Sequence, residues 1–462
     1  MSLAGAVLTT SSAITLIAFW LFDIVIGGTI HPYVGVIFFL ILPGIFVLGL
    51  VLMPIGALVH RYQLRKAGEL PAQYPQVDLS MASLRHALGW VAGLTVANII
   101  IFTVGAYRGV EYMDSVKFCG QTCHTVMQPE FTAYQISPHA RVECVQCHIG
   151  PGASWFVRSK LSGLHQVYAV TFHTYDRPIP VPVQNLRPAR ATCEQCHWPE
   201  AFTGDKLEVI RSFEEDEKNT ELTTVLLLKI GGHTWDGEVG IHGRHLDPNR
   251  PIEYVSIDQH RQTIAQVSYV DDTTGKRVVF TQTDPKPMAQ QLAAGEHREM
   301  DCIDCHNRPT HTFQLPGRAL DQAMARGQVS PELPFIKKEA LAALKAKYPD
   351  RDTARREIAA TLEAFYRKSY PDVYSQKQSL LETSIRGVQT IYLDNIFPAM
   401  NITWGTYPNN LGHMDFPGCF RCHDGSHTSA NGKTIPNDCD TCHTVLAMQE
   451  QNPKVLADLG IK

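Results

Sequence analysis

"FCGQTCHTVMQPE" (residues 118–130) follows the third long apolar run of the chain and carries two cysteines and a histidine. Cys119 and Cys123 are separated by three residues, and His124 follows them directly. A cysteine pair followed by a histidine is the arrangement that attaches a haem covalently and supplies a ligand to its iron. The usual spacing, Cys-x-x-Cys-His, is one residue shorter, so the interpretation of this segment depends on the other cysteines.

All 12 cysteines of the chain occur in six pairs, and a histidine directly follows each pair. The pairs are Cys119/Cys123, Cys144/Cys147, Cys193/Cys196, Cys302/Cys305, Cys419/Cys422 and Cys439/Cys442, and the histidines are His124, His148, His197, His306, His423 and His443. Five pairs have the spacing of covalent haem attachment. We therefore predict six covalently bound haems c, with each of these histidines as the proximal ligand of an iron.

Other uses of cysteine pairs fit this pattern less well. A zinc ribbon takes four ligands from two knuckles and needs no trailing histidine. A redox-active Cys-x-x-Cys is expected once rather than six times, and disulfides place no demand on the next residue. Covalent haem attachment also predicts a location outside the cytoplasm, such as a bacterial periplasm.

Length and charge narrow the class further. A chain of 462 residues has room for two or three domains. Its formal net charge of −4 argues against a nucleic-acid-binding protein.

Three apolar runs lie in the first quarter of the chain, at 13–30, 33–59 and 87–107. Each approaches or exceeds the roughly 20 residues that a helix needs to cross a bilayer. The fold class that we predict is therefore a membrane-anchored multihaem cytochrome c. It has three N-terminal transmembrane helices, followed by a largely irregular and α-helical haem domain with a small antiparallel β insertion.

The basic residues predict the orientation of these helices. The loop before the third run contains Arg61, Arg65, Lys66 and Arg85, whereas the loop between the first two runs contains neither Lys nor Arg. Positive charge marks the cytoplasmic side. We expect the N-terminus to be cytoplasmic and everything after residue 108 to be periplasmic, at a bacterial inner (cytoplasmic) membrane.

The chain divides by composition and motif spacing into seven segments. They are an N-terminal transmembrane hairpin (1–60), a cytoplasmic loop (61–86), the third transmembrane helix (87–108), a three-haem unit (109–205), a linker and β insertion (206–300), a fourth haem with a helical segment (301–395) and a C-terminal two-haem unit (396–462).

Local patterns predict the secondary structure between the motifs. We expect the acidic segment 205–220 to be a solvated linker or helix, and the β-branched runs of 221–285 to form antiparallel strands. Helices are expected at 318–327, 336–347 and 352–369, with Asp352 and Thr353 as caps of the last.

Each low-spin haem also needs a second, distal axial ligand. The chain has 20 histidines, of which six follow the cysteine pairs. The distal candidates are His139, His242, His245, His311, His413 and His427, which lie close to a motif or, for His242 and His245, beside the β insertion. No motif ends in Lys, the mark of the open catalytic haem in pentahaem nitrite reductases. The arrangement therefore favours an electron-transfer wire over a terminal reductase.

The order of these features resembles the NapC/NirT/NrfH family of membrane-anchored quinol dehydrogenases. The resemblance lies in "EYMDSVKFCGQTCHTVMQPEF", "YQISPHARVECVQCH" and "LRPARATCEQCHWPE", after a membrane helix, and covers about residues 88–200. Family members usually have one membrane helix and four haems. The additional helices, β insertion and C-terminal haems of this chain look like the inner-membrane multihaem cytochromes of metal-reducing bacteria.

The resemblance implies a function and several further site residues. Family members oxidise menaquinol or ubiquinol beside the first haem and pass electrons to a periplasmic cytochrome or reductase. It implies Met127 as a ligand of the first iron. Because the motif has an extra residue, the choice between His124 and Met127 as that ligand stays open. It further implies Lys160 as a candidate distal ligand, and Glu111 and Asp114 as acceptors of quinol protons.

Two functions remain as alternatives. The first is a hexahaem cytochrome that oxidises quinol and relays electrons to a periplasmic acceptor. The second is an electron-transfer subunit of a larger membrane respiratory complex without its own quinol site. The second is motivated by Asp23 in the first apolar run and by the uncharged second run, because extra membrane helices can dock other subunits.

Overall fold

The computed structural model describes residues 1–26, 34, 36–69, 79–122, 124–150, 152–183, 186–198, 204–232, 239–271 and 274–461. Within them the chain forms two compact units. The first contains residues 1–127 and 143–145, and the second contains residues 128–142 and 146–462. Cys123 and the side chains of Asp23 and His124 lie outside the described part of the structure.

The first unit contains three helices that are long and apolar enough to cross a membrane, as predicted. They are α1 (Ser2–Ile26), α3 (Leu42–Ala67, preceded by the π-helical turn η1, Ile37–Ile41) and α4 (Ala82–Asp114). The first helix begins earlier than the apolar run at residue 13. The polar residues at its start are compatible with a helix because their hydroxyls can donate hydrogen bonds to carbonyls of the preceding turn. Ser11 Oγ donates such a bond to the carbonyl of Val7 at 2.8 Å.

Helices α1 and α3 pack through glycines. A Cβ atom added to Gly5 would lie 2.7 Å from the carbonyl oxygen of Gly49, and one added to Gly49 would lie 2.7 Å from the amide nitrogen of Thr9. Such contacts let two backbones approach closely, as is common between membrane helices. Leu16 and Phe46 are each 1% exposed beside this contact.

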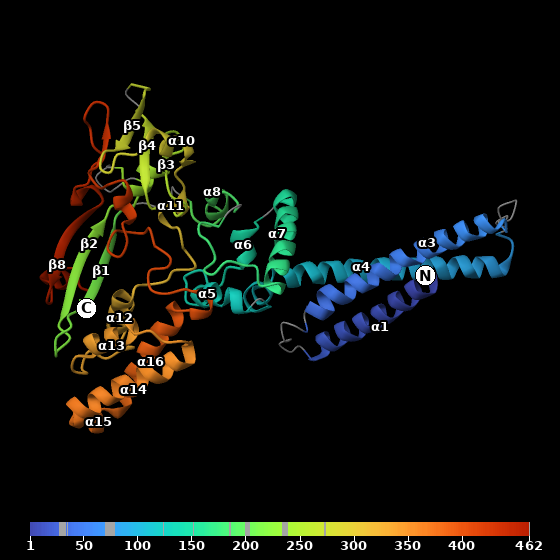
Figure 1. Cartoon of the computed structure of the whole chain (residues 1–462), viewed down its shortest axis with the longest axis horizontal. Helices are drawn as coiled ribbons and strands as arrows, with labels where there is room; N and C mark the ends of the chain where they lie inside the picture. Colours follow the sequence, from blue (N-terminus) through green and yellow to red (C-terminus); the bar gives the residue numbers. More distant parts are fainter. Residues whose placement is uncertain are drawn as a thin grey trace. The chain divides into compact units, whose positions relative to one another are not determined.

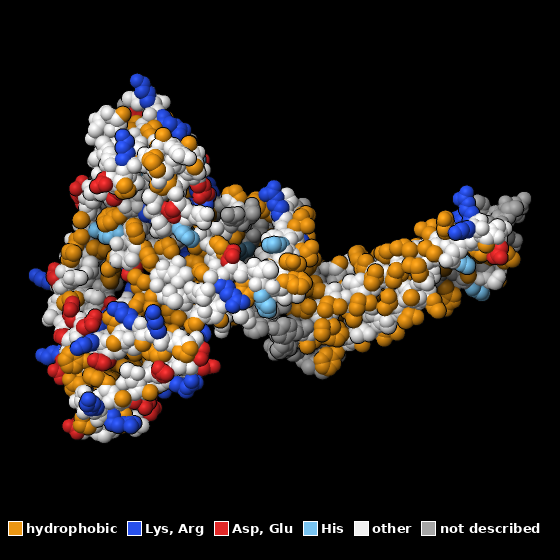
Figure 2. Space-filling model, in the orientation of Figure 1, with side chains coloured by type: hydrophobic (Ala, Val, Ile, Leu, Met, Phe, Trp, Pro, Cys, Tyr) orange, Lys and Arg blue, Asp and Glu red, His pale blue; other side chains and the backbone are white. Residues whose placement is uncertain are grey.

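The outer surface of the three helices is apolar. Figure 2 shows hydrophobic side chains over most of this part of the molecule. Large side chains along α4, such as Trp90 and Ile99, are well exposed. A surface of this kind is expected to contact lipid rather than water.

Short helical segments link the membrane helices to the rest of the chain. They are η2 (Phe118–Thr122), α5 (His124–Gln135), α6 (Cys144–His148), α7 (Ala153–Thr171) and α8 (Ala189–Cys193). Figure 1 shows α7 as the longest of them.

The second unit contains two antiparallel sheets. The smaller has the strand order β1 (Lys206–Phe213), β2 (Glu221–Leu228), β8 (His443–Glu450). The larger has the order β6 (Glu296–Glu299), β3 (Glu253–Ser256), β4 (Ile264–Val270), β5 (Arg277–Gln282), β7 (His427–Ser429). Strands β7 and β8 come from the last part of the chain, so this part completes both sheets (Figure 1).

The predicted β runs within 221–285 are confirmed, but the interpretation of 205–220 as a linker or helix is wrong. Residues 206–213 form strand β1, which pairs with β2 from Lys206↔Leu228 to Phe213↔Glu221. Its sequence, KLEVIRSF, offers apolar residues for a half-buried strand. The acidic residues that suggested a linker are concentrated just beyond the strand, in the turn before β2.

A helical subdomain follows the sheets. Its helices are α12 (Pro316–Ala325), α13 (Ile336–Lys345), α14 (Arg351–Ser369), α15 (Pro371–Gln376) and α16 (Gln378–Asn395). The three predicted helices are confirmed, and they pack with α16 around a core that includes Leu344, Ile358, Leu362 and Val388. The predicted cap of α14 is wrong: Asp350 is the N-cap, and its carboxylate accepts a hydrogen bond from the Thr353 amide at 2.7 Å.

The remaining short elements lie around the cysteine motifs and the sheets. They are α9 (Ile241–His245), α10 (Ala289–Ala294), α11 (Cys302–Cys305), η4 (Pro398–Met400), η5 (Gly418–Arg421), η6 (Cys439–Thr441) and α17 (Lys454–Asp458).

The close contact between α1 and α3 predicts the effect of a single methyl group. Gly49→Ala forces the new Cβ against the backbone of Thr9, so we expect it to destabilise the helix pair by about 1–3 kcal/mol. The measurement is the midpoint of thermal unfolding of the full chain in detergent. Gly93→Ala is the matched control, because a Cβ at Gly93 meets nothing within 4 Å. Equal midpoints for the two variants would contradict the close packing.

Candidate functional site

The cysteine motifs form single turns of helix. In three of them the histidine amide donates to the carbonyl of the first cysteine: His197 to Cys193 at 2.8 Å, His306 to Cys302 at 2.8 Å and His423 to Cys419 at 3.0 Å. Residues three and four positions apart on a helix are neighbours on one face. The turn therefore presents both sulfur atoms and the imidazole ring from one short piece of backbone.

The predicted attachment cysteines differ in their exposure, which the repeated motif alone did not indicate. Cys147, Cys196 and Cys439 are exposed, and these three do not match the picture of a sulfur enclosed by the surrounding protein. The other described cysteines are partly buried; they are Cys119, Cys144, Cys193, Cys302, Cys305, Cys419, Cys422 and Cys442.

Two of the exposed cysteines lie at or beyond the end of a short helical turn. Cys147 lies near the end of the single turn α6, and Cys196 lies beyond the end of α8, in a turn that its amide closes on the Cys193 carbonyl at 3.1 Å. Turn length does not explain their exposure, because both cysteines of the shorter turn α11 are partly buried. The role of Cys147 and Cys196 in haem attachment stays a prediction from the motif, and their surroundings add no support of their own.

Five motif histidines each face a second histidine ring from another part of the chain. The distances between ring centroids are 6.2 Å for His148–His311, 6.0 Å for His197–His139, 6.4 Å for His306–His242, 6.0 Å for His423–His245 and 6.1 Å for His443–His413. Two nitrogen–metal bonds of about 2 Å, with about 1 Å from each nitrogen to its ring centroid, together span about 6 Å. The spacing thus fits one metal ion between the two rings of each pair.

Backbone carbonyls orient four of these rings. The Nδ1 atoms of His242, His245, His311 and His423 lie 2.5, 2.8, 3.0 and 2.6 Å from the carbonyl oxygens of Ile230, Ile241, Glu130 and Pro436. An Nδ1–H group that donates to a carbonyl fixes the tautomer and leaves the Nε2 lone pair for a metal. These contacts are the usual support of a metal-binding histidine.

An ion pair between Arg308 and Glu130 stabilises the position of His311. Arg308 donates to both carboxylate oxygens of Glu130, at 3.0 and 2.9 Å, and both side chains are largely buried. Glu130 in turn accepts the His311 Nδ1–H through its backbone oxygen. The bidentate pair therefore fixes the segment that orients this ring.

Two other rings have an unsatisfied atom. The Nδ1 atoms of His139 and His443 are buried and have no hydrogen-bond partner among the described residues. A buried polar nitrogen without a partner is costly. These two rings therefore lack the Nδ1 support that the other four have among the described residues.

Burial favours the neutral form of five of the ten paired histidines. It lowers the pKa of His148, and the charge of the neighbouring His311 lowers that pKa further. Burial likewise lowers the pKa values of His245, His306, His311 and His443. Since a histidine binds a metal in its neutral form, the environment favours metal ligation at neutral pH.

The remaining distal candidates have other surroundings. His427 is fully buried, and its Nδ1 and Nε2 atoms lie 2.9 Å from Asp424 Oδ1 and 2.8 Å from the Ile264 carbonyl. Both of its nitrogens are thus used within the protein, where they hold β7 against β4. Lys160 lies on α7 with its Nζ 4.7 Å from the ring centroid of Phe156. Met127 is half-buried on α5.

The candidates for proton transfer lie at the end of α4. Glu111 forms an ion pair with Arg108 at 2.9 Å, and both side chains are about half exposed. Asp114 is the last residue of the helix, five positions before Cys119. Tyr112, between them, stacks on Phe39 with ring centroids 5.2 Å apart. The two carboxylates are therefore close along the chain to the first cysteine motif.

Several cysteine motifs lie side by side. The thiols of Cys119 and Cys144 are close enough for a hydrogen bond, which lowers the pKa of Cys144, and Cys302 lowers the pKa of Cys193 in the same way. Burial raises the pKa values of Cys305 and Cys442, and the nearby thiol of Cys419 raises them further. The first motif thus adjoins the second, the third adjoins the fourth, and the fifth adjoins the fourth and the sixth.

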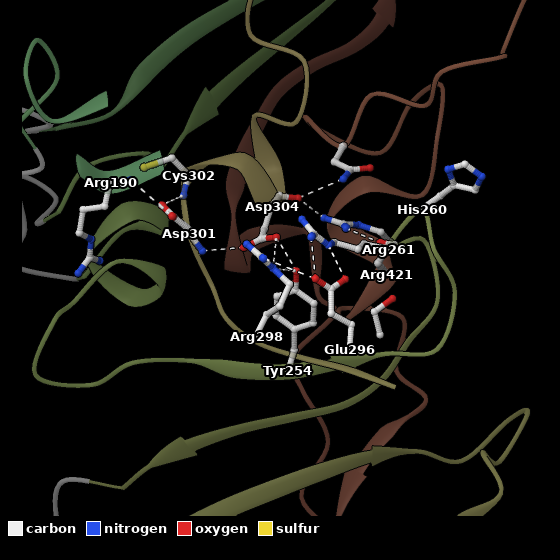
Figure 3. A network of polar contacts seen from close by, with 12 residues as sticks. Arg190, Tyr254, His260, Arg261, Glu296, Arg298, Asp301, Cys302, Asp304 and Arg421 are labelled. Carbon is white, nitrogen blue, oxygen red and sulfur yellow. Dashed lines mark hydrogen bonds and ion pairs between the residues drawn. The ribbon is translucent and has the colours of Figure 1, made fainter. Parts of the chain in front are cut away.

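A buried polar network holds the fourth motif (Figure 3). Asp304, inside this motif, accepts a hydrogen bond from the Tyr254 hydroxyl at 2.5 Å and from the Asp301 amide at 2.7 Å. Arg298 lies 3.7 Å from the same carboxylate and donates to the Tyr254 hydroxyl at 3.2 Å. Burial and the Asp304 charge raise the pKa of Tyr254, which keeps its hydroxyl protonated as a donor.

The same network reaches the fifth motif. Arg421, inside that motif, donates to the backbone carbonyl of Asp304 at 2.5 Å and to that of Arg261 at 2.8 Å. Asn410 also donates to the Asp304 carbonyl, at 3.1 Å. These bonds fix the fourth and fifth motifs relative to each other. The sequence pattern did not indicate this network. Four motifs have a charged residue between their cysteines (Glu194, Asp304, Arg421 and Asp440), and the pattern does not show which of these are buried.

Cysteine–histidine motifs that face distant histidines, on a chain with three membrane-length helices, define the class: the protein is a membrane-anchored multihaem c-type cytochrome. More particularly, the chain belongs to the NapC/NirT cytochrome c family, whose N-terminal region matches residues 81–179.

Two relatives illustrate the extent of this likeness. The chain is 41% identical over 456 residues to the cytochrome c-type protein ImcH of Geobacter sulfurreducens, across 98% of this chain and 89% of that protein. It is 28% identical over 103 residues to the cytochrome c-type protein NrfH of Wolinella succinogenes, across 22% of this chain and 58% of that protein. No solved structure matches the chain.

The network around Asp304 predicts a large effect of removing one carboxylate. Asp304→Ala leaves Arg298 and the Asp301 amide without their buried acceptor, so we expect the free energy of unfolding to fall by about 3 kcal/mol. Guanidinium unfolding followed by circular dichroism measures the change. Glu253→Ala is the control, because Glu253 pairs with Arg277 at the surface and its loss should change little. A stability of Asp304→Ala equal to that of the control would contradict a structural role for the network.

Proposed function

We propose that this chain is a hexahaem cytochrome that oxidises quinol at the membrane and relays the electrons to a periplasmic acceptor. The observation that carries the proposal is the set of five facing histidine pairs, each built on a cysteine motif. A bound haem supplies reversible one-electron chemistry at its iron. The residues of the chain decide what that chemistry can be used for.

Two histidines at one iron favour electron transfer over catalysis. In this proposal His148, His197, His306, His423 and His443 bind from one side, and His311, His139, His242, His245 and His413 bind from the other. A haem held by two imidazoles in this way would have no position left for a substrate. The first motif stands apart, with His124 and Met127 as its candidate ligands and Lys160 as a further candidate implied by the family.

The adjacency of the motifs supports a relay. Cys144 of the second motif contacts Cys119 of the first motif. The second motif also crosses, along the chain, from the first unit into the second. There the third and fourth motifs adjoin, followed by the fifth and the sixth. We propose that electrons enter near the first motif and leave near the sixth.

An apolar cavity in the membrane unit supports a quinol site. Its volume is about 300 Å³, and its lining consists of Leu16, Pro43, Gly44, Phe46, Val47, Ile101, Phe102, Gly105 and Ala106. From Ala106 to Glu111 the helix rises only about 7.5 Å. We propose that the cavity takes part of an isoprenoid tail while the quinol head lies nearer the end of α4.

Quinol oxidation releases two protons with two electrons, so the head group needs proton acceptors. Glu111 and Asp114 follow the cavity on the same helix and precede Cys119. A carboxylate within hydrogen-bond reach of a hydroxyl can serve as its general base. We assign this role to these two residues.

The orientation follows from the charges at the helix ends. Arg65 and Lys66 lie in the last turn of α3, and Arg85 lies in the first turns of α4. We propose that this end and the N-terminus are cytoplasmic and that the haem-bearing part of the chain, after residue 108, is periplasmic. The electron acceptor is then a periplasmic cytochrome or reductase.

The ligand assignment predicts different outcomes for two histidines that flank the fifth motif. His413→Ala removes the ring opposite His443, so we expect one haem to become high-spin. His427→Ala should lower stability without a high-spin signal, because the contacts of His427 are to Asp424 and Ile264. Low-temperature electron paramagnetic resonance separates the two, with a pyridine haemochrome assay to count the haems, expected to be six per chain. A high-spin signal from His427→Ala alone would overturn the assignment.

The proton acceptors predict a loss of quinol oxidation. Glu111→Gln combined with Asp114→Asn should slow haem reduction by a menaquinol analogue by about 100-fold, the typical contribution of a general base. The measurement is the rise of the haem α-band after the analogue is mixed with the full chain in vesicles. Glu69→Gln is the control, because Glu69 follows α3 at the opposite end of the membrane helices.

The same assay tests the alternative function. If the unaltered chain alone is not reduced by the analogue, quinol oxidation by this chain is refuted. Reduction that appears only when a co-purified membrane subunit is restored would instead support the electron-transfer subunit of a larger complex.

A further inference from the structure

Helix α7 (Ala153–Thr171) exposes an unusual run of apolar side chains. Val157, Leu161, Leu164, Tyr168 and Phe172, the last at its C-cap, are 56%, 65%, 69%, 56% and 62% exposed. Their spacings of four, three, four and four residues place them on one face of the helix. They therefore form a continuous stripe, named here the α7 stripe.

A stripe of this kind needs a partner. Contiguous exposed apolar surface is rare on soluble proteins and marks contacts with lipid or with other proteins. Elsewhere in the described part of the second unit, exposed side chains such as Trp198 and Phe420 directly adjoin a cysteine motif, where a porphyrin would cover them. The α7 stripe begins nine residues after the nearest preceding motif histidine, His148.

The charges of α7 favour a lipid surface over a protein. The helix contains no Asp or Glu, and its two long basic residues, Arg158 and Lys160, lie near its start. Arg158 lies 5.1 Å from the ring centroid of Trp155, and Lys160 lies 4.7 Å from that of Phe156. Basic side chains beside aromatic rings, with an apolar stripe, are the composition of helices that lie in a membrane interface.

The path of the chain places α7 close to the membrane. Residues 143–145 belong to the same compact unit as the membrane helices, and Cys144 contacts Cys119, five positions after α4 ends. The eight residues from Val145 to Ala153 can span at most about 28 Å. The length of the chain therefore allows the helix to reach the bilayer surface.

We propose that α7 is an interfacial helix that lies in the surface of the bilayer. The α7 stripe enters the boundary between acyl chains and headgroups, and Arg158 lies against anionic lipid headgroups. The second unit thereby gains a contact with the membrane that is separate from the three spanning helices. This contact restrains the segment after the second motif at the level of the bilayer surface.

Photo-crosslinking tests the proposal on the full chain in vesicles that contain phosphatidylglycerol. A benzophenone amino acid replaces Leu164, or Leu94 on α4 as the lipid-exposed reference, or Leu459 near the C-terminus as an exposed apolar residue outside the stripe. We expect lipid adducts at Leu164 and Leu94 and none at Leu459. Adducts at Leu164 only with protein, or none at all, would overturn the proposal.

A double variant distinguishes contact of the α7 stripe with lipid from contact of the stripe with a haem. Leu161→Glu with Leu164→Glu should keep the haem content and absorption spectrum and raise deuterium exchange of α7 in vesicles by at least 10-fold. Arg158→Gln should weaken the Leu164–lipid adduct in anionic vesicles and have no effect in phosphatidylcholine vesicles. Loss of haem or a changed spectrum in the double variant would show that the stripe packs on a porphyrin and would refute the lipid contact.

Discussion

In the proposed assignment two imidazoles approach one metal from opposite sides, and this constraint shapes the haem-bearing part of the second unit. A histidine at the end of a Cys-x-x-Cys turn can supply only one of them, so the other must come from elsewhere in the chain. This requirement accounts for the short helical turns, loop segments and sheet edges that converge in pairs of rings about 6 Å apart. The helical subdomain carries none of these rings and builds its own core around Leu344, Ile358 and Leu362.

The polar contacts around the rings serve the same constraint. Carbonyl oxygens of Ile230 and Pro436 hold individual imidazoles by Nδ1, while Arg421 ties two motifs together through the backbone of Asp304. Because each bond is short and directed, it fixes orientation as well as position. Orientation matters to a relay, since the angle and spacing of neighbouring porphyrins follow from the turns that carry them.

The sequence predicted the elements better than their partners. Apolar length identified α1, α3 and α4, and periodicity identified α12, α13 and α14, because both signals are local. The prediction failed at β1, where the acidic residues of the following turn outweighed the pattern of a strand.

Nearness in sequence also suggested which histidines lie at the motifs, but not which motif each one faces: His311 follows the fourth motif and faces the second. A residue a few positions from a motif is held on that motif's own side, so the opposite side is filled from a distance that only the fold determines. The same limit applies to the cysteines. Five motifs with the same spacing did not indicate that Cys147 and Cys196 would be exposed while Cys305 and Cys422 are partly buried.

The long separation between the members of each ring pair has a consequence for how the molecule is assembled. A metal bound between His245 and His423 closes a loop of well over a hundred residues, much as a disulfide does, and so removes a large part of the disorder of the unfolded chain. Strands β7 and β8 follow His423 and complete the two sheets. In the proposed assignment these links are inserted after synthesis, and the second unit reaches its final topology once the last segment of the chain has received them.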